Sequence, residues 1–290
     1  MGIIVGPNTA VLVQGITGHQ GAMHTEEMLK YGTRVVAGVT PGKSGSTVHG
    51  VPVYDSVEDA LAAHPEINTS IIFVPAPAAP DAVYEAIDSG IKSIVVITEH
   101  IPVHDTTRFV VYARARGVIL VGPNTPGVIT PPRVKVGIMP GDYFTPGTVG
   151  LMSRSGTLTY EVSLELSRHG LGVSTAVGIG GDPVTGLSFE DVYRLFQNDE
   201  DTKAIVLIGE IGGNKEEQFA QFYSRLAERK PIVAYIAGRA APPGKKMGHA
   251  GAIVYGRQGT YSSKVEALTS AGIPVAQTLT DIPRLLKELV

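Results

Sequence analysis

The chain contains no cysteine among its 290 residues. This absence excludes disulfide bonds, zinc sites with cysteine ligands and catalysis by a thiol. It does not identify a compartment, because a protein of the cytosol has no need of disulfides. The basic segment and apolar run of a signal peptide do not appear near the N-terminus. No apolar run approaches the roughly 20 residues that would span a bilayer. We therefore expect a soluble, cytoplasmic protein.

Charges of one sign do not gather in blocks either. The 24 basic and 27 acidic residues give a net charge of −3 and are mixed along the chain. Binding to nucleic acid or to a membrane surface would require concentrated positive charge. Composition therefore supports neither class of partner. The length favours two domains, and an apolar fraction of 43% can fill two cores.

Short apolar runs alternate with longer amphipathic stretches along most of the chain. Continuous apolar runs are typical of strands covered on both faces, and their alternation with helices implies parallel sheets in an α/β protein. The predicted strands are Ala10–Val13, Val35–Val39, Ser70–Val74, Ser93–Ile97, Val118–Val121, Val149–Met152, Val173–Val177, Ala204–Ile208, Ile232–Ile236 and Pro274–Ala276. The predicted helices are Met23–Tyr31, Asp81–Ser89, Thr106–Arg116, Thr157–Arg168, Phe189–Asn198, Glu216–Glu228, Ser262–Ser270 and Ile282–Leu289.

One region breaks this alternation. Between Gly122 and Gly147 the chain holds six prolines and several glycines. Such punctuation is typical of a boundary between domains. We therefore predict a first domain over residues 1–125, a linker over 126–147 and a second doubly wound domain over 148–290.

A glycine loop joins the first predicted strand to the first predicted helix. Gly15 to Gly21 follow the spacing G-x-x-G-x-x-G, which differs from the G-x-G-x-x-G dinucleotide fingerprint. Glycines let the backbone turn tightly and let a phosphate approach the amides at a helix N-terminus. A NAD site would place an acid about 20 residues further on. Here Lys43 follows the second strand, which suits an extra phosphate, as in NADP or coenzyme A. A structural turn with a solvated lysine is the alternative.

The same region contains a misleading pattern. Ala37 to Ser44 fit a relaxed Walker A motif, but a true P-loop opens a helix. The residues that follow, Gly45 to Gly50, are typical of a turn and then a strand. We predict that this segment is not a P-loop.

A second candidate phosphate site begins the second domain. Ser153 to Thr157 combine hydroxyl groups, a glycine and an arginine at the start of a predicted helix. The helix dipole and free amides favour an anion there. Ordinary capping of the helix by serine or threonine explains the pattern equally well.

Among the eight histidines, His249 has the most suggestive surroundings. It lies among glycines and alanine in a loop after the strand Ile232–Ile236, at the carboxyl end of a sheet, where α/β folds bind ligands. Imidazole acts as a nucleophile when a carboxylate orients its other nitrogen, and Glu210 at a neighbouring strand end is the candidate. His100 and His104 have metal-pair spacing, but Pro102 argues against one helix presenting both.

Taken together, these motifs resemble the alpha-subunit family of succinyl-CoA synthetase over essentially the whole chain. The matching segments of the first half are Gln14–Gly21, Gly38–Lys43, Val74–Pro77, Ile97–Glu99, Gly122–Asn124 and Pro126–Gly127. Those of the second half are Ser153–Glu161, Val177–Pro183, Gly209–Gly213 and Gly244–Ile253. The resemblance implies a Rossmann-like CoA-binding domain followed by a flavodoxin-like ligase domain.

The resemblance also implies roles for individual residues. His249 would be phosphorylated during turnover, with Glu210 steadying it and Tyr160 lying at the acyl substrate. The helix that begins at Ser155, Gly156 and Thr157 would direct its N-terminus at the phosphohistidine. The implied coenzyme A contacts are Thr17, Gly18, His19, Gln20, Lys43, Ile97, Thr98 and Glu99. No metal ligand is implied in this chain.

In the implied reaction, phosphate displaces coenzyme A from succinyl-CoA, His249 takes the phosphoryl group from succinyl phosphate, and ADP or GDP receives it. Nothing in the chain resembles a nucleotide-grasping domain. The family places ATP or GTP and Mg²⁺ on a beta subunit, so an obligate partner is expected, in a heterodimer or heterotetramer. Small-molecule substrates are succinate, coenzyme A and phosphate, with no nucleic acid or membrane partner.

Two positions depart from the family pattern, and other functions stay open. Thr125 stands where relatives commonly have cysteine, and His19 stands where many have a small polar residue. The closest alternative is the alpha subunit of a related acid–CoA ligase, such as malate–CoA ligase, because acid specificity depends partly on the partner. A non-catalytic CoA-binding protein is the alternative from another class. A NADP-linked oxidoreductase is disfavoured, because the second half shows no hydride-transfer residues.

Overall fold

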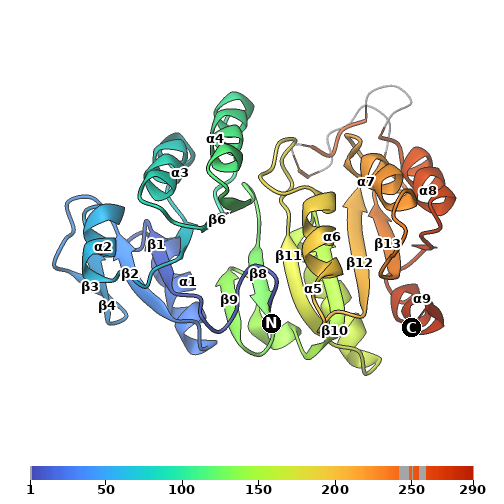
Figure 1. Ribbon diagram of the computed structural model, residues 1–290, viewed down its shortest axis with the longest axis horizontal. Helices are drawn as coiled ribbons and strands as arrows, with labels where there is room; N and C mark the ends of the chain where they lie inside the picture. Colours follow the sequence, from blue (N-terminus) through green and yellow to red (C-terminus); the bar gives the residue numbers. More distant parts are fainter. Residues whose placement is uncertain (1, 242–247, 250, 255–258, 290) are drawn as a thin grey trace. The chain divides into compact units, whose positions relative to one another are not determined.

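The structure, a computed structural model, describes residues 2–241, 248–249, 251–254 and 259–289. The chain divides into two compact units. The first unit comprises Ile4–Gly141 and Val184–Gly186, and the second comprises Asp142–Pro183 and Leu187–Val290 together with the first three residues. Both are α/β sandwiches of helices around a mainly parallel sheet (Figure 1). Within the described ranges, no helix is both long and apolar enough to cross a membrane.

The sheet of the first unit has seven strands in the order β3-β4-β2-β1-β5-β6-β7. All pair in parallel except the short edge strand β3. The strands are β1 (Val11–Gln14), β2 (Val35–Val39), β3 (Thr47–Val48), β4 (Val51–Tyr54), β5 (Thr69–Ile72), β6 (Ser93–Val96) and β7 (Ile119–Val121). The strand order reverses at β1, because the chain proceeds from β1 through β2 to β4 and then returns to β5 on the other side. Such a reversal opens a crevice at the carboxyl ends of the strands.

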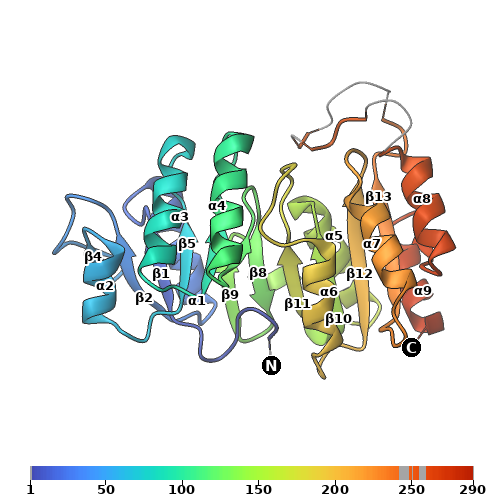
Figure 2. The ribbon, with the colours of Figure 1, turned by 45° about the horizontal axis from the view of Figure 1, so that its top comes forward.

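Four helices cover this sheet. They are α1 (His19–Lys30), α2 (Val57–Ala63), α3 (Ala79–Asp88) and α4 (Val103–Ala115), with a short 3-10 turn at Ala76–Ala78. Helices α2, α3 and α4 lie on one face, and α1 lies on the other (Figure 2). The core between helices and sheet includes Leu12, Ile72, Ile94 and Phe109, none of which is exposed. The near-continuous apolar strands of the sequence are thus explained by coverage on both faces.

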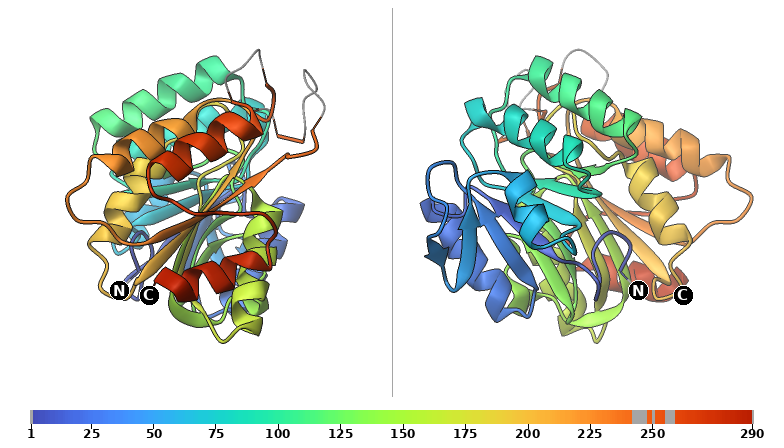
Figure 3. Two further views of the ribbon diagram at one scale, coloured as in Figure 1. Left: turned by 90° about the vertical axis from the view of Figure 1, so that its right-hand side faces the viewer. Right: turned by 60° about the vertical axis from the view of Figure 1, so that its left-hand side comes forward.

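The second unit repeats the plan with parallel strands in the order β14-β13-β12-β10-β11. The strands are β10 (Pro146–Ser153), β11 (Val173–Gly178), β12 (Ala204–Glu210), β13 (Ile232–Ala237) and β14 (Val275–Ala276). The helices are α5 (Gly156–Arg168), α6 (Phe189–Gln197), α7 (Lys215–Ser224), α8 (Tyr261–Ser270) and α9 (Asp281–Leu289). Helices α5 and α9 lie on one face and α6, α7 and α8 on the other (Figure 3). Here the strand order reverses at β10.

The segment 126–147, predicted as a linker, contains regular structure instead. It holds the antiparallel hairpin of β8 (Gly127–Thr130) and β9 (Val134–Gly137), then a 3-10 turn at Gly141–Tyr143. The backbone amide of Lys135 donates to the Thr33 hydroxyl at 3.0 Å, which ties the hairpin to the first unit. A Cβ atom on Gly127 would lie 2.2 Å from the carbonyl oxygen of Val136, so this glycine permits close strand pairing rather than flexibility. The two units divide after Gly141.

The other differences from the sequence prediction are local. Helix α2 is an addition; it is capped at Ser56, whose hydroxyl accepts from the Asp59 amide at 3.1 Å. Helix α1 begins at His19, four residues before its predicted start, because its first turn is polar and glycine-rich. The rejection of a P-loop is confirmed, since Ser44 leads to strand β3 and not to a helix. Helix α4 begins after Pro102, three residues before its predicted start at Thr106, so it includes His104. It excludes His100, and one helix therefore does not present both histidines, as predicted.

Helix α4 offers a direct test of which face builds the first core. Phe109 is fully buried there, whereas Val111, two residues along the same helix, is 62% exposed. We expect Phe109→Ala to lower the free energy of unfolding of the first unit by about 3–5 kcal/mol, because it removes a large side chain and leaves a cavity. Val111→Ala, the matched control, should change it by less than about 0.5 kcal/mol. Urea unfolding followed by circular dichroism measures both. Equal effects would contradict the assignment of this helix face to the core.

Candidate active site

The carboxyl ends of the second sheet bring together residues far apart in the sequence. Strand β10 ends at Ser153 and leads into α5, β11 leads into the glycine-rich segment before Pro183, and β12 ends at Glu210. Because β10 lies between β11 and β12, these three ends are adjacent. They surround the point where the strand order reverses, which is the usual ligand position in this class of fold.

His249 and Glu210 meet at this edge. The Nδ1 atom of His249 lies 2.8 Å from Oε2 of Glu210. The Glu210 side chain is 8% exposed and that of His249 is 31% exposed. The hydrogen bond to Glu210 raises the pKa of His249 above its ordinary value, and it outweighs burial, which lowers it. The pairing predicted from the two strand-end motifs is present.

This geometry fixes what the imidazole can do. An ionised carboxylate only accepts hydrogen bonds, so Nδ1 of His249 is the donor and carries the proton. In the neutral ring Nε2 then holds the lone pair. Because the side chain is partly exposed and the ring is oriented, Nε2 is suited to nucleophilic attack on an electrophile such as phosphorus.

Gly181 packs directly against the His249 ring. A Cβ atom at Gly181 would lie 2.6 Å from Cγ of His249, closer than such atoms approach. The backbone of this segment therefore limits the ring on one side while Glu210 holds its edge. Confinement of this kind reduces the motion that a nucleophile must lose before reaction.

The start of α5 shows the ordinary helix capping that was one of the two interpretations of its sequence. The Ser155 hydroxyl caps the helix by accepting from the Leu158 amide at 3.4 Å. Gly156 and Thr157 form the first turn, and Thr157 is exposed. Ordinary capping is thus present, and an anion-binding role for Ser155, Gly156 and Thr157 stays a prediction.

Tyr160 lies one turn further along the same helix. Its ring packs edge-on against Phe144, with centroids 6.3 Å apart. Burial raises the pKa of Tyr160 to about 12. The phenol is therefore neutral at physiological pH and can donate a hydrogen bond. Its predicted position at the acyl substrate stays a prediction.

Arg154 has a different role from the one the sequence suggested. The sequence pattern counted it among the groups that would hold an anion. It is instead 2% exposed, and its guanidinium pairs with Glu210 and Glu216. The local sequence did not indicate these partners. Glu216 lies in the first turn of α7, where the helix dipole alone favours acidic residues.

The first unit shows a second strand-to-helix site at its own switch point. Gly15 has a φ of +81°, which favours glycine. A Cβ atom on Gly21 would lie 2.2 Å from the Gly15 carbonyl oxygen, so both glycines are required for the tight turn. Helix α1 then starts with Gly18 as its N-cap, and no side chain of the described residues caps it. Its first amides are consequently free to bind a phosphate.

The predicted coenzyme A residues of this loop lie at the surface of that edge. Thr17, Gly18, His19 and Gln20 are all exposed. The Thr17 hydroxyl donates to that of Thr40 at 3.1 Å, which joins the ends of β1 and β2.

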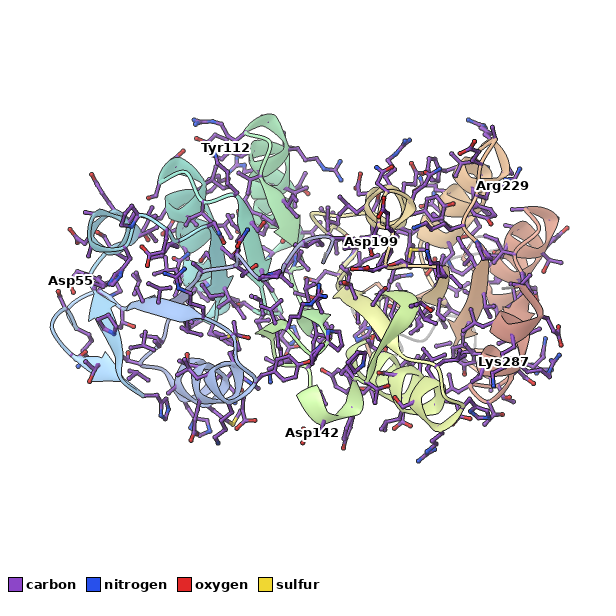
Figure 4. The ribbon with its side chains drawn as sticks, turned by 60° about the horizontal axis from the view of Figure 1, so that its bottom comes forward. Asp55, Tyr112, Asp142, Asp199, Arg229 and Lys287 are labelled. Atoms are coloured by element: carbon purple, nitrogen blue, oxygen red, sulfur yellow. The ribbon has the colours of Figure 1, made fainter. Side chains whose placement is uncertain are left out.

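Lys43 follows β2 at the same edge and is exposed. The carboxylate of Asp55 accepts from the backbone amides of Lys43 and Ser44, both at 3.0 Å. Asp55, labelled in Figure 4, follows β4 and was not singled out from the sequence. Asp55 fixes the turn through these backbone amides and does not engage the Lys43 side chain in either bond.

Ile97, Thr98 and Glu99 follow β6. The Thr98 hydroxyl donates to the Val74 carbonyl oxygen at 2.7 Å, which fixes the turn beside β5. Ile97 and Thr98 are half-buried, and Glu99 is exposed and lies 3.5 Å from His100. Parallel pairing thus places all the predicted coenzyme A residues at one edge of the first sheet. Contact with the ligand itself stays a prediction.

Comparison with known proteins matches a different family model to each half of the chain. A CoA binding domain family model matches residues 7–100, and a CoA-ligase family model matches residues 152–273. The chain is 55% identical over 290 residues to "Succinate--CoA ligase [ADP-forming] subunit alpha 2" of Archaeoglobus fulgidus, covering 100% of both chains. It is 56% identical to "Succinate--CoA ligase [ADP-forming] subunit alpha" of Methanothermobacter thermautotrophicus, covering 94% of this chain and 92% of the relative.

Among solved structures, ATP citrate lyase of Methanosaeta concilii in complex with (3S)-citryl-CoA superposes with a TM-score of 0.90 at 25% identity. The match covers 99% of this chain but 50% of that one, so the chain spans half the length of the lyase. The fold of the whole chain therefore recurs as part of a larger protein.

The hydrogen bond between Glu210 and His249 predicts a change in titration. Glu210→Gln should lower the pKa of His249, because it removes the carboxylate that raises it while burial and Arg154 still act against the imidazolium. Since the folded-state pKa is raised, this pair stabilises the fold fully below the ordinary pKa of about 6.5 and loses its effect as pH rises through the raised value. NMR titration of the His249 ring measures the shift. A pKa that stays unchanged in Glu210→Gln would contradict the assignment.

Proposed function

The chain belongs to the succinate–CoA ligase alpha-subunit family, and on that premise we propose that it carries the phosphohistidine of a succinate–CoA ligase that forms ADP or GDP. The observation that supports this most directly is the 2.8 Å hydrogen bond between Nδ1 of His249 and Glu210 at the carboxyl edge of the second sheet. It leaves Nε2 as the nucleophile. A protein that only bound coenzyme A would have no use for an oriented imidazole there.

The proposed reaction has three reversible steps. Phosphate attacks the thioester carbonyl of succinyl-CoA, and coenzyme A leaves as succinyl phosphate forms. Nε2 of His249 then attacks the phosphorus, the bond between phosphorus and the acyl oxygen breaks, and succinate leaves as a carboxylate. Finally a terminal oxygen of ADP or GDP takes the phosphoryl group, which regenerates neutral His249. Similar bond energies are exchanged at each step, so catalysis comes chiefly from positioning and charge stabilisation.

Glu210 contributes during the second step. The imidazole becomes positively charged when Nε2 bonds to phosphorus, and the carboxylate at Nδ1 stabilises that charge. The N-terminus of α5 at Ser155, Gly156 and Thr157 would stabilise the negative phosphoryl oxygens. Tyr160, neutral at physiological pH, would donate to the acyl substrate.

The first unit would bind coenzyme A at its switch point. The first-turn amides of His19 and Gln20 suit the diphosphate, with Thr17 and Gly18 beside them. Lys43, held on a turn fixed by Asp55, suits the 3′-phosphate. Ile97, Thr98 and Glu99 would complete the site at the end of β6.

The proposal includes a partner. The relatives are named as alpha subunits, which implies a beta subunit. We expect that subunit to bind ATP or GTP with Mg²⁺ and to join this chain in a heterodimer or heterotetramer. A cytoplasmic location is part of the same proposal.

Phosphoryl transfer to His249 is the central test. The chain, reconstituted with its beta subunit, labelled ATP and Mg²⁺, should gain an acid-labile, base-stable label at His249. Succinate with coenzyme A should remove the label, and His249→Asn should never acquire it. Malate in place of succinate should leave the label in place.

Two other outcomes would point elsewhere. Loss of label with malate rather than succinate would identify a related acid–CoA ligase. Absence of label in the wild type, with a beta subunit active beside another alpha subunit, would leave a CoA-binding protein.

Lys43 gives a separate test of the first unit. Lys43→Ala should weaken coenzyme A binding about tenfold, the effect of losing one charge-assisted contact. Affinity for dephospho-coenzyme A, which lacks the 3′-phosphate, should not change. Isothermal titration calorimetry measures both ligands, and Lys30→Ala on the exposed face of α1 is the matched control. An equal loss for the two ligands would contradict the assignment of Lys43 to the 3′-phosphate.

A further inference from the structure

A continuous chain of buried ion pairs lies behind the His249–Glu210 pair. Glu210 contacts Arg154, Arg154 contacts Glu216, and Glu216 contacts Lys264. The side chains of Arg154, Glu216 and Lys264 are at most 1% exposed. They come from three different places in the second unit: the β10–α5 junction, α7 and α8. Charges so fully removed from water are costly, and such clusters add little to stability compared with apolar packing.

Arg154 holds Glu210 at two places. Its Nη1 donates to the backbone carbonyl oxygen of Glu210 at 3.3 Å, and its Nη2 lies 3.3 Å from Oε1 of the same residue. Oε1 receives no hydrogen bond from the described residues, so this ion pair is its main contact. A planar guanidinium can make these contacts at once, which a lysine could not.

Glu216 and Lys264 hold Arg154 in turn. Oε1 of Glu216 accepts from Nη1 of Arg154 at 2.9 Å and from the backbone amide of Glu210 at 3.1 Å. Lys264 donates to Oε2 of Glu216, and also to Glu217 at 2.9 Å and to the Gly213 carbonyl oxygen at 3.1 Å. Burial opposes ionisation of Glu216, but Arg154 and Lys264 together lower its pKa below the ordinary value.

These contacts account for every polar atom of Glu210. Its amide, its carbonyl oxygen and Oε1 all meet Arg154 or Glu216, and only Oε2 remains to face His249. Arg154 is also closely packed against Gly251, because a Cβ atom on Gly251 would lie 3.0 Å from Nη2 of Arg154. The carboxylate therefore has one orientation available, and that orientation aims Oε2 at Nδ1.

We propose that Arg154 is a positioning residue for phosphoryl transfer: anchored by Glu216 and Lys264, it fixes the carboxylate of Glu210 and, through it, the Nε2 of His249 that attacks phosphorus. This rests on the proposed function. Arg154 is buried and paired with carboxylates, so it would act through Glu210 and not on the reacting groups. Misplacement of a reacting atom by about 1 Å can cost a hundredfold in rate, so support of this kind has a large effect.

The cluster also sets the charge around His249. Among the described residues, Glu210, Arg154 and Asp182 act on His249, and Lys215 interacts with Glu210. Glu216 and Glu217 act on Arg154, and Lys264 pairs with both of these carboxylates. Arg154 lowers the pKa of His249, against the dominant effect of Glu210. Removing a cation or an anion from this set should therefore move the pKa of His249 in opposite directions.

A charge cycle tests the proposal. Arg154→Gln should raise the pKa of His249, Glu216→Gln should lower it, and the double variant should return it close to the wild-type value. Single-turnover transfer from His249 in the reconstituted enzyme should nevertheless stay about 10- to 100-fold slower in Arg154→Gln and in the double variant, with the KM for coenzyme A unchanged. The matched control neutralises the exposed pair of Arg284 and Glu288 on α9 and should change neither quantity.

The outcomes separate this proposal from the proposed function. If wild type is never labelled at His249, the function fails. If wild type is labelled and Arg154→Gln transfers within twofold of it at its own optimum pH, the positioning role is wrong. Should Arg154→Gln fail to fold, Arg154→Lys replaces it: a slow rate with a nearly normal pKa of His249 supports the proposal, and a normal rate overturns it.

Discussion

A carboxylate that leaves water must meet positive charge or hydrogen-bond donors, and this constraint governs the second unit. Glu210 and Glu216 are both buried, so Arg154 and Lys264 are buried with them. The groups that pair with Glu210 also need space. Gly251 leaves room for the Arg154 guanidinium, and Gly181 leaves room for the His249 ring. The glycines near His249 are therefore explained by close packing: a larger residue at Gly181 or Gly251 would collide with the His249 ring or with Arg154.

The two units share one topological feature but differ in how the helix that follows it begins. Each has a parallel sheet whose order reverses at its first strand, β1 or β10, and each places a helix N-terminus directly after that strand. In the first unit the helix is left uncapped by the described side chains, which suits a ligand held by backbone amides. In the second the helix is capped by Ser155, and His249 comes to the same sheet edge from another loop.

Much of this arrangement could be predicted from the sequence, and the exceptions have physical causes. Strands such as Val35–Val39 were predicted to the residue, because a short apolar run rich in valine is typical of a strand covered on both faces. The pairing of His249 with Glu210 was also predicted, because the ends of parallel strands lie at one edge. The β8–β9 hairpin was missed, since its glycines and prolines were interpreted as signs of a flexible connection when they allow close backbone contact.

The remaining misses concern contacts over long sequence distances. Asp55 holds the Lys43 turn from another strand, and Arg154 meets Glu216 across 62 residues. No local pattern distinguishes an arginine that binds an anion from one that supports a carboxylate. The assignments of Thr17, Tyr160 and Thr157 to particular ligands stay predictions for a related reason, because they depend on a bound molecule.

The buried cluster also has a consequence for biosynthesis. Its members are supplied by residues as far apart as Arg154 and Lys264, and α8 is made after both the β10–α5 junction and α7. A nascent chain that lacks α8 would have to bury Glu216 without its lysine, which is unfavourable. The pair of His249 and Glu210 is therefore expected to take its observed geometry only after α8 has been made.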